Sequence, residues 1–160
     1  EWARLDRGSI TEAEAIASMC ERLPQRLHQA AADLVTKWDQ PIVPMEGMTE
    51  LVEELKQAGY GVYLLSNATL RQREYWPRVP ASRFFDGTLI SAGVKLVKPQ
   101  PEIYALLCKT FGLTPSECFM IDDVPQNIEG AVEAGMSGFV FNEEAQALRE
   151  ALKKTGVRLA

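Results

Sequence analysis

The hydrophobic and polar positions divide the chain near residue 44. Up to residue 40, apolar residues recur at helical spacing and predict two helices separated by Pro24. Residues 9–12, Ser-Ile-Thr-Glu, have the spacing of a capping box and predict that the first helix begins there. The apolar faces comprise Ala13, Ile16, Ala17 and Cys20 in the first helix, and Leu27, Ala30, Ala31, Leu34 and Trp38 in the second. The stiff connector Pro41–Pro44 then indicates a boundary.

After this connector, short apolar runs alternate with amphipathic segments. The runs predict buried strands at residues 61–65, 88–91, 118–121 and 138–141. The amphipathic segments predict helices at residues 49–58, 68–76, 101–111, around 128–132, and 143–154. Such alternation is typical of βαβ units with a mostly parallel sheet. We therefore predict an α/β fold, with a helical region over residues 1–43 and a core over residues 44–160.

Composition narrows the function classes. The 160 residues are 46% hydrophobic and 24% charged, as in a globular domain, and the net charge is −5. Lys and Arg are scattered, which argues against a nucleic-acid partner, and no apolar run approaches the ~20 residues that span a membrane. Cys20, Cys108 and Cys118 lack metal-ligand spacing, which favours a cytoplasmic setting. The single histidine, His28, disfavours a Ser-His-Asp hydrolase or a His-rich metal site.

Candidate chemistry lies after the predicted strands, where ligands bind in open α/β sheets. Ser66 and Asn67 follow the first strand and could hydrogen-bond a phosphate oxygen, or could cap the next helix. Asp122 and Asp123 follow the third strand and suit Mg²⁺, although Asp123 could cap the helix that follows. Lys98 could neutralise a phosphoryl group at the same edge, or could be an ordinary solvated charge.

An Asp-Gly-Thr sequence at residues 86–88 resembles part of a phosphatase nucleophile loop. Asp86 precedes a predicted strand instead of following one, however, and no aspartate stands two residues before it. We therefore interpret this segment as a turn.

The order of these motifs resembles the haloacid dehalogenase superfamily. Ser66-Asn67, Lys98-Pro99, and Asp122-Asp123 followed by Asn127-Ile128 and Gly130-Ala131 resemble its second, third and fourth motifs. The resemblance covers residues 44–160 and implies a Rossmann-like parallel sheet, while residues 1–43 resemble a partial helical cap. Together with Trp76-Pro77, the motifs look most similar to glucose-1-phosphatase-like sugar-phosphate phosphatases.

The resemblance implies a Mg²⁺-dependent phosphatase of small phosphorylated metabolites. Asp122 and Asp123 would hold Mg²⁺, Ser66 and Asn67 would bind the phosphoryl group, and Lys98 would stabilise it and the nucleophile. By the same resemblance, the loop that holds the metal would be supported by Asn127.

One part of the family pattern has no counterpart in this sequence. The family nucleophile belongs to an Asp-x-Asp motif after a first strand, and no Asp-x-Asp occurs here. That strand is expected between the strands that end at Leu65 and Ile121. We therefore expect that an N-terminal segment is absent from this sequence and that the chain as printed is inactive. A 2-haloacid dehalogenase, a phosphomutase and a non-catalytic binding domain derived from a hydrolase stay open as alternatives.

Overall fold

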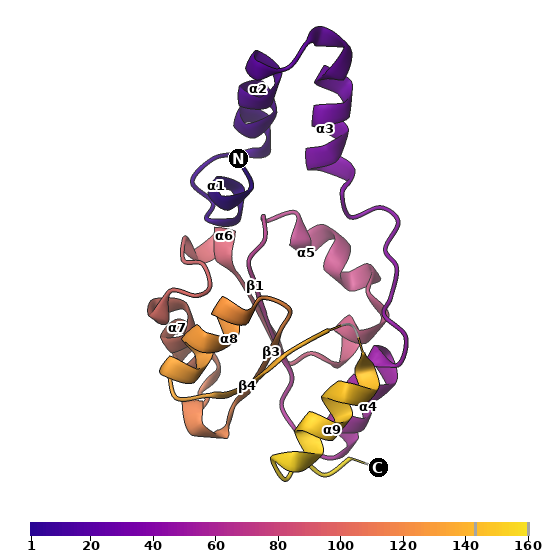
Figure 1. The fold of residues 1–160 in the computed structure, drawn as a ribbon, viewed down its shortest axis with the longest axis vertical. Coiled ribbons are helices and arrows are strands. Elements are labelled where there is room, and N and C mark those ends of the chain that lie inside the picture. The colour runs from indigo at the N-terminus through magenta and orange to yellow at the C-terminus, as the bar shows by residue number, and fades with distance from the viewer. Residues whose placement is uncertain (143, 160) are drawn as a thin grey trace.

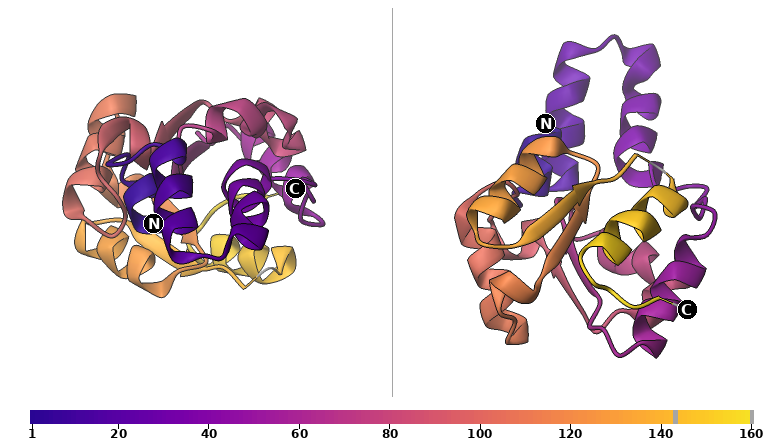
Figure 2. Two further views of the ribbon diagram at one scale, coloured as in Figure 1. Left: turned by 90° about the horizontal axis from the view of Figure 1, so that it is seen from above. Right: turned by 60° about the horizontal axis from the view of Figure 1, so that its bottom comes forward.

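The computed structural model describes residues 1–142 and 144–159 and shows a helical cap standing on an α/β core (Figure 1). The cap contains α1 (Trp2–Asp6), α2 (Glu12–Arg22), a 3-10 turn (Gln25–Leu27) and α3 (His28–Lys37). Helices α2 and α3 form a hairpin that projects away from the core, as Figure 1 and the right view of Figure 2 show. Its own small core is centred on Leu5, Ala15 and Val35, which are buried.

Three details of the predicted cap are wrong. In α2 the buried residue is Ala15, whereas Ala13 and Ala17 of the predicted apolar face are exposed. The capping box is shifted by two residues, because Thr11 is the N-cap of α2 and exchanges hydrogen bonds with Glu14. The apolar face predicted for the second helix is also displaced: α3 buries Ala31 and Val35, whereas Leu34 and Trp38 are 49% and 46% exposed. A two-helix hairpin covers only one narrow side of each helix, so part of the apolar stripe stays in contact with water.

The core follows the predicted alternation. Its strands and helices are α4 (Met48–Gln57), β1 (Tyr63–Ser66), α5 (Gln72–Tyr75), β2 (Gly87–Ile90), α6 (Ser91–Val94), α7 (Pro101–Phe111), β3 (Phe119–Asp122), α8 (Pro125–Glu133), β4 (Ser137–Val140) and α9 (Ala145–Lys154). Short 3-10 turns occupy Trp76–Arg78, Pro80–Phe84 and Pro115–Glu117. All four predicted strands are confirmed within two residues. The last helix was predicted from Glu143, which lies outside the described residues.

One core helix is shorter than predicted. Residues 68–76 were expected to be helical, but α5 begins only at Gln72. The backbone N–H of Ala68 instead donates to the hydroxyl of Ser91, directly after the neighbouring strand. This tertiary hydrogen bond holds residues 67–71 as a loop, which no local pattern indicated.

The strands form two parallel pairs. β1 pairs with β2, with Leu65 opposite Leu89, and β3 pairs with β4, with Ile121 opposite Phe139. Among the described residues no ladder joins β1 to β3, so the expected single sheet is present as two halves. The two strands nevertheless lie near each other at the centre of the molecule (Figure 1).

Helices cover both faces of these strands. Because successive side chains of a strand point to opposite faces, β3 contributes to two cores. Met120 packs with α7 and α8 on one face, whereas Phe119 and Ile121 pack with α4 and α9 on the other. None of the described helices is both long enough and apolar enough to cross a membrane.

Candidate functional site

The loop after β1 holds the segment that carries Lys98. The side-chain amide of Asn67 donates to the Lys98 carbonyl at 3.0 Å and accepts from the Lys98 N–H at 2.8 Å. Both polar atoms of the Asn67 side chain thus bind the backbone of one residue, Lys98. Neither Ser66 nor Asn67 caps a helix, since Arg71 is the residue that precedes α5. Ser66 ends β1 and is half-buried, and no other described residue hydrogen-bonds its hydroxyl.

Lys98 joins the ends of the two strand pairs. Its ammonium donates to the carbonyl of Leu65 in β1 at 2.8 Å and to the carboxylate of Asp122 in β3 at 2.5 Å. The Lys98 and Asp122 side chains are only 8% and 5% exposed. Lys98 is therefore not an ordinary solvated charge. It forms a buried ion pair at the edge of the sheet where ligands bind in this class of fold.

The two adjacent aspartates occupy different environments. Asp122 has partners for both oxygens: Oδ2 accepts from Lys98, and Oδ1 accepts from the Val124 N–H at 2.9 Å and the Asn127 amide at 2.8 Å. Asp123 is exposed, and its carboxylate makes no hydrogen bond to the described part of the chain. The helix-capping alternative for Asp123 is wrong, because Val124 precedes α8 and Asp122 binds its N–H.

A second layer of contacts supports Asp122, and the sequence reasoning missed one of its members. Asn127 is buried beneath Asp122, and its carbonyl accepts from the hydroxyl of Tyr104 at 2.6 Å. Burial, with a smaller contribution from the charge of Asp122, raises the pKa of Tyr104 to about 12. The phenol therefore stays a protonated donor at neutral pH. A helical spacing of apolar residues marks Tyr104 only as core, so no local signal identified this role.

Another close approach lies between α8 and the Lys98 loop. A Cβ built on Gly130 would stand 2.9 Å from both the carbonyl oxygen and Cβ of Pro99. Only glycine allows α8 to come this near, which brings Asn127 and Asp122 to Lys98. The Gly130-Ala131 motif of the sequence thus has a packing explanation.

The carboxylates at this edge can supply only part of the coordination shell of a hard cation. Both oxygens of Asp122 are engaged, so Asp123 is the carboxylate with oxygens available for a ligand. No group of three or more Asp, Glu, His or Cys side chains suited to a metal occurs in residues 1–142 and 144–159. Mg²⁺ requires only one or two protein carboxylates when waters and substrate oxygens complete its shell. The donor set therefore suits a partly protein-bound Mg²⁺.

Asp86 has a structural role, as expected for a turn. Its carboxylate accepts from the Lys56 ammonium at 2.7 Å and from the Val62 N–H at 2.8 Å. These hydrogen bonds, that of Lys56 first, lower the pKa of Asp86. The carboxylate thus fastens the entrance of β1 to that of β2, away from Lys98.

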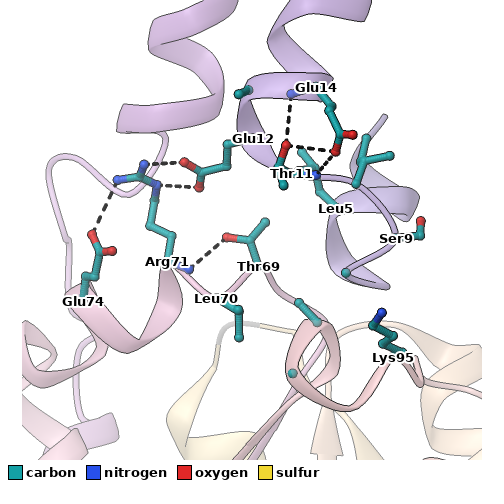
Figure 3. A pocket seen from close by; sticks show the side chains of 15 residues that line it. Leu5, Ser9, Thr11, Glu12, Glu14, Thr69, Leu70, Arg71, Glu74 and Lys95 are labelled. Carbon is teal, nitrogen blue, oxygen red and sulfur yellow. Dashed lines mark hydrogen bonds and ion pairs between the residues drawn. The ribbon is translucent and has the colours of Figure 1, made fainter.

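A cleft of about 730 Å³ lies between the cap and the core (Figure 3). Its walls come from the α1–α2 region of the cap and from the segments after β1 and β2, which include Thr69, Arg71 and Lys95. Its lining does not include Ser66, Lys98 or Asp122. The structure therefore separates this cleft from the Lys98–Asp122 ion pair.

Comparison with known proteins gives a consistent result. The family model for haloacid dehalogenase-like hydrolases matches residues 2–135. The chain is 28% identical over 116 residues to flavin mononucleotide hydrolase 1 of Arabidopsis thaliana, across 72% of this chain and 47% of that protein. It is 31% identical over 117 residues to glyceraldehyde 3-phosphate phosphatase of Methanothermobacter thermautotrophicus, across 71% of this chain and 52% of that protein. The chain thus spans about half the length of these relatives.

A solved structure shows the same architecture. The chain superimposes with a TM-score of 0.71 and 26% identity on a haloacid dehalogenase family enzyme of Bacteroides thetaiotaomicron, in complex with magnesium and inorganic phosphate. The match covers 91% of this chain and 77% of that one. The similarity therefore includes both the cap and the core.

Proposed function

The chain belongs to the haloacid dehalogenase-like hydrolases, and from this premise we propose that it supplies the phosphoryl-binding part of a Mg²⁺-dependent phosphatase of small phosphorylated metabolites. The observation that carries the proposal is the buried Lys98 ammonium, held between the Leu65 carbonyl and the Asp122 carboxylate. A positioned cation at the edge of the sheet stabilises the negative charge of a transferring phosphoryl group without needing to reorganise.

The side chains divide the work of phosphate binding. The Ser66 hydroxyl, at the end of β1, would donate to a phosphoryl oxygen. Asn67 would act as a positioning residue, because its amide is already engaged by the Lys98 peptide. This differs from the sequence expectation that both residues contact the phosphoryl group.

The metal would be held mainly by Asp123. Asp122 would orient Lys98 and the loop, while the exposed Asp123 carboxylate would contribute oxygens to Mg²⁺. When bound, Mg²⁺ would neutralise charge on the phosphoryl oxygens. The magnesium and phosphate in the related Bacteroides thetaiotaomicron structure support a role for Mg²⁺ beside a phosphoryl group.

The nucleophile would come from outside this sequence. We propose a strand carrying Asp-x-Asp that lies between β1 and β3, each of which is paired on one side only within the described residues. Its first aspartate would bond to phosphorus as the bond to the leaving alcohol breaks, and water would then release phosphate. By this account the chain as printed binds phosphate but does not catalyse the hydrolysis of a phosphate ester.

Calorimetry with inorganic phosphate, with and without Mg²⁺, tests the proposal on this chain. We expect Mg²⁺-dependent binding that weakens about tenfold in Asp123→Asn, the scale of one charge-assisted contact. Asp86→Asn is the matched control, since Asp86 is a carboxylate far from Lys98, and it should leave binding unchanged. Equal binding by wild type and Asp123→Asn would contradict the metal assignment.

Turnover assays separate the other functions. Phosphate release by this chain, abolished in Asp123→Asn, would contradict the predicted inactivity. Halide release from a 2-haloacid without Mg²⁺ would favour the dehalogenase alternative. Transfer of phosphate between two positions of one substrate, without release, would favour a phosphomutase.

A further inference from the structure

The joint between cap and core lacks a shared apolar core. The buried cap cluster around Leu5, Ala15 and Val35 draws only on residues of the cap. The two core clusters draw only on residues from Met48 onward. Among the described residues, therefore, no buried apolar cluster spans the joint, and other contacts must hold the cap in place.

One of these contacts is a two-point ion pair (Figure 3). The Arg71 guanidinium donates to Glu12 through Nε at 2.7 Å and through Nη2 at 2.5 Å. Arg71 directly precedes α5 in the core, and Glu12 is the first residue of α2 in the cap. Bidentate Arg–carboxylate pairs are among the stronger and more directional polar contacts.

A second ion pair holds the other side of the cap. Arg78 donates to Oδ2 of Asp39, which follows α3 and whose side chain is 3% exposed. The neighbouring Trp38 ring meets the Tyr75 ring edge-on, with centroids 5.4 Å apart. The core segment of residues 71–78 thus contacts the start of α2 and the end of α3, the two places where the hairpin meets the core.

A third contact fixes α1. The Ser91 hydroxyl, fully buried at the start of α6, donates to the Asp6 carbonyl at 2.5 Å and accepts from the Ala68 N–H. Next to it, a Cβ on Gly8 would stand 2.3 Å from the Ala92 carbonyl oxygen, so the two backbones touch. Ser91 therefore connects the cap to the same loop that carries Asn67.

We propose that Arg71 and Arg78 form an ionic latch that seats the cap, and that breaking either pair opens the joint without unfolding either part. The inference is independent of the phosphatase proposal. Because no buried apolar cluster spans the joint, the two Arg–carboxylate pairs carry most of the directional attraction between the cap and the core. Both arginines are positioning residues, because they act on the place of the cap.

Hydrogen exchange at the joint measures the latch directly. The amides of Ala68 and Ala92 lie at the joint, where Ser91 contacts Asp6 and Gly8 approaches Ala92, so their exchange reports opening. We expect about fivefold faster exchange there in Arg71→Gln, and about tenfold in Arg78→Gln, which leaves the buried Asp39 without its cation. Exchange in α7, within the core, should not change.

A matched control separates the latch from a general loss of stability. Arg149 and Glu54 form a bidentate pair at 2.6 Å, inside the core between α9 and α4, with exposures of 19% and 24%. The Arg71–Glu12 pair has similar exposures of 22% and 27%. Arg149→Gln should leave exchange at the joint unchanged. Equal acceleration by Arg149→Gln and Arg71→Gln would overturn the proposal.

Swapping the charges of Glu12 and Arg71 gives a second, independent test of the latch. Glu12→Arg alone should open the joint, and combining it with Arg71→Glu should restore at least part of the protection. Raising the salt concentration should accelerate exchange in wild type more than in the variant that lacks both arginines. Absence of both the rescue and the salt effect would show that the arginines do not act as a latch.

Discussion

Ion pairs at the sheet edge and at the cap joint differ in how completely their charges are satisfied. Lys98 and Asp122 are withdrawn from water, and every oxygen of Asp122 has a donor. At the joint, Arg71 and Glu12 are about a quarter exposed, and Arg78 is half exposed while Oδ1 of Asp39 has no donor among the described residues. An ion pair that is buried and fully hydrogen-bonded fixes the site in place. Ion pairs that are partly exposed, or that leave an oxygen without a donor, form a joint that can open.

The largest effect is expected from breaking the saturated pair. Asp122→Ala leaves the Lys98 ammonium buried without a counter-charge and should lower the free energy of unfolding by about 3–5 kcal/mol. Asp123→Ala, one residue away but exposed, should change it by no more than about 0.5 kcal/mol. Urea unfolding of the two variants measures the difference. Equal losses would refute the division of roles between the adjacent aspartates.

A steric change at the joint should rank second. Gly8 has a φ of +66°, and a Cβ there would also meet the Ala92 carbonyl oxygen, so Gly8→Ala should cost about 2–4 kcal/mol through backbone strain and overpacking. Gly59 has a φ of +87° with open space around it, so Gly59→Ala should cost only about 1–2 kcal/mol of strain. Thermal or urea unfolding compares the two. The extra loss of unfolding free energy in Gly8→Ala over Gly59→Ala measures the close contact with Ala92 alone. Equal losses would mean that the backbone at the joint moves to make room for the Cβ.

Loss of the Asn67 side-chain hydrogen bonds should lower the free energy of unfolding by a smaller amount. Asn67→Ala removes two contacts to the half-buried Lys98 peptide and should destabilise the chain by about 2 kcal/mol. Asn67→Asp keeps the acceptor for the Lys98 N–H but sets a carboxylate oxygen against the Lys98 carbonyl oxygen, so it should lose at least half as much. Urea midpoints give both values. An alanine variant as stable as wild type would show that Lys98 is positioned by other contacts.

The sequence predicted these regions unequally, and the reason is physical. The core strands and α7 were found because their signals are local: a short apolar run, Pro101 at the helix start and Gly112 in the left-handed conformation at its end. The shortened α5 and the ion pair of Asp122 depend on distant partners: Ser91 is 23 residues from Ala68, and Lys98 is 24 residues from Asp122. Local patterns carry no information about such partners.

The same reasoning explains how the site was partly predicted. The strand ends predicted that Lys98 and Asp122 meet at one edge of the sheet, because parallel strands bring their carboxyl ends together. The split between Asp122 and Asp123 was not foreseen, although neighbouring residues leaving a strand point to opposite sides. Tyr104 was missed because an aromatic residue on a helix face looks like core, and its hydroxyl shows its role only where it meets Asn127.

The smallest effect is expected in the capping box of α2, next to the joint. Hydrogen bonds from the Thr11 N–H, and then from its hydroxyl, lower the pKa of Glu14 below its ordinary value of 4.5. The contribution of this carboxylate is complete above that value and is lost as the pH falls through the lowered pKa. Amides at the start of α2 should therefore lose protection as the pH falls below about 4.5, after correction for intrinsic exchange rates. Glu14→Gln should reduce this pH dependence, and α7, which begins without a side-chain cap, should show none in either protein. The same acid dependence in wild type and Glu14→Gln would show that another group controls the start of α2.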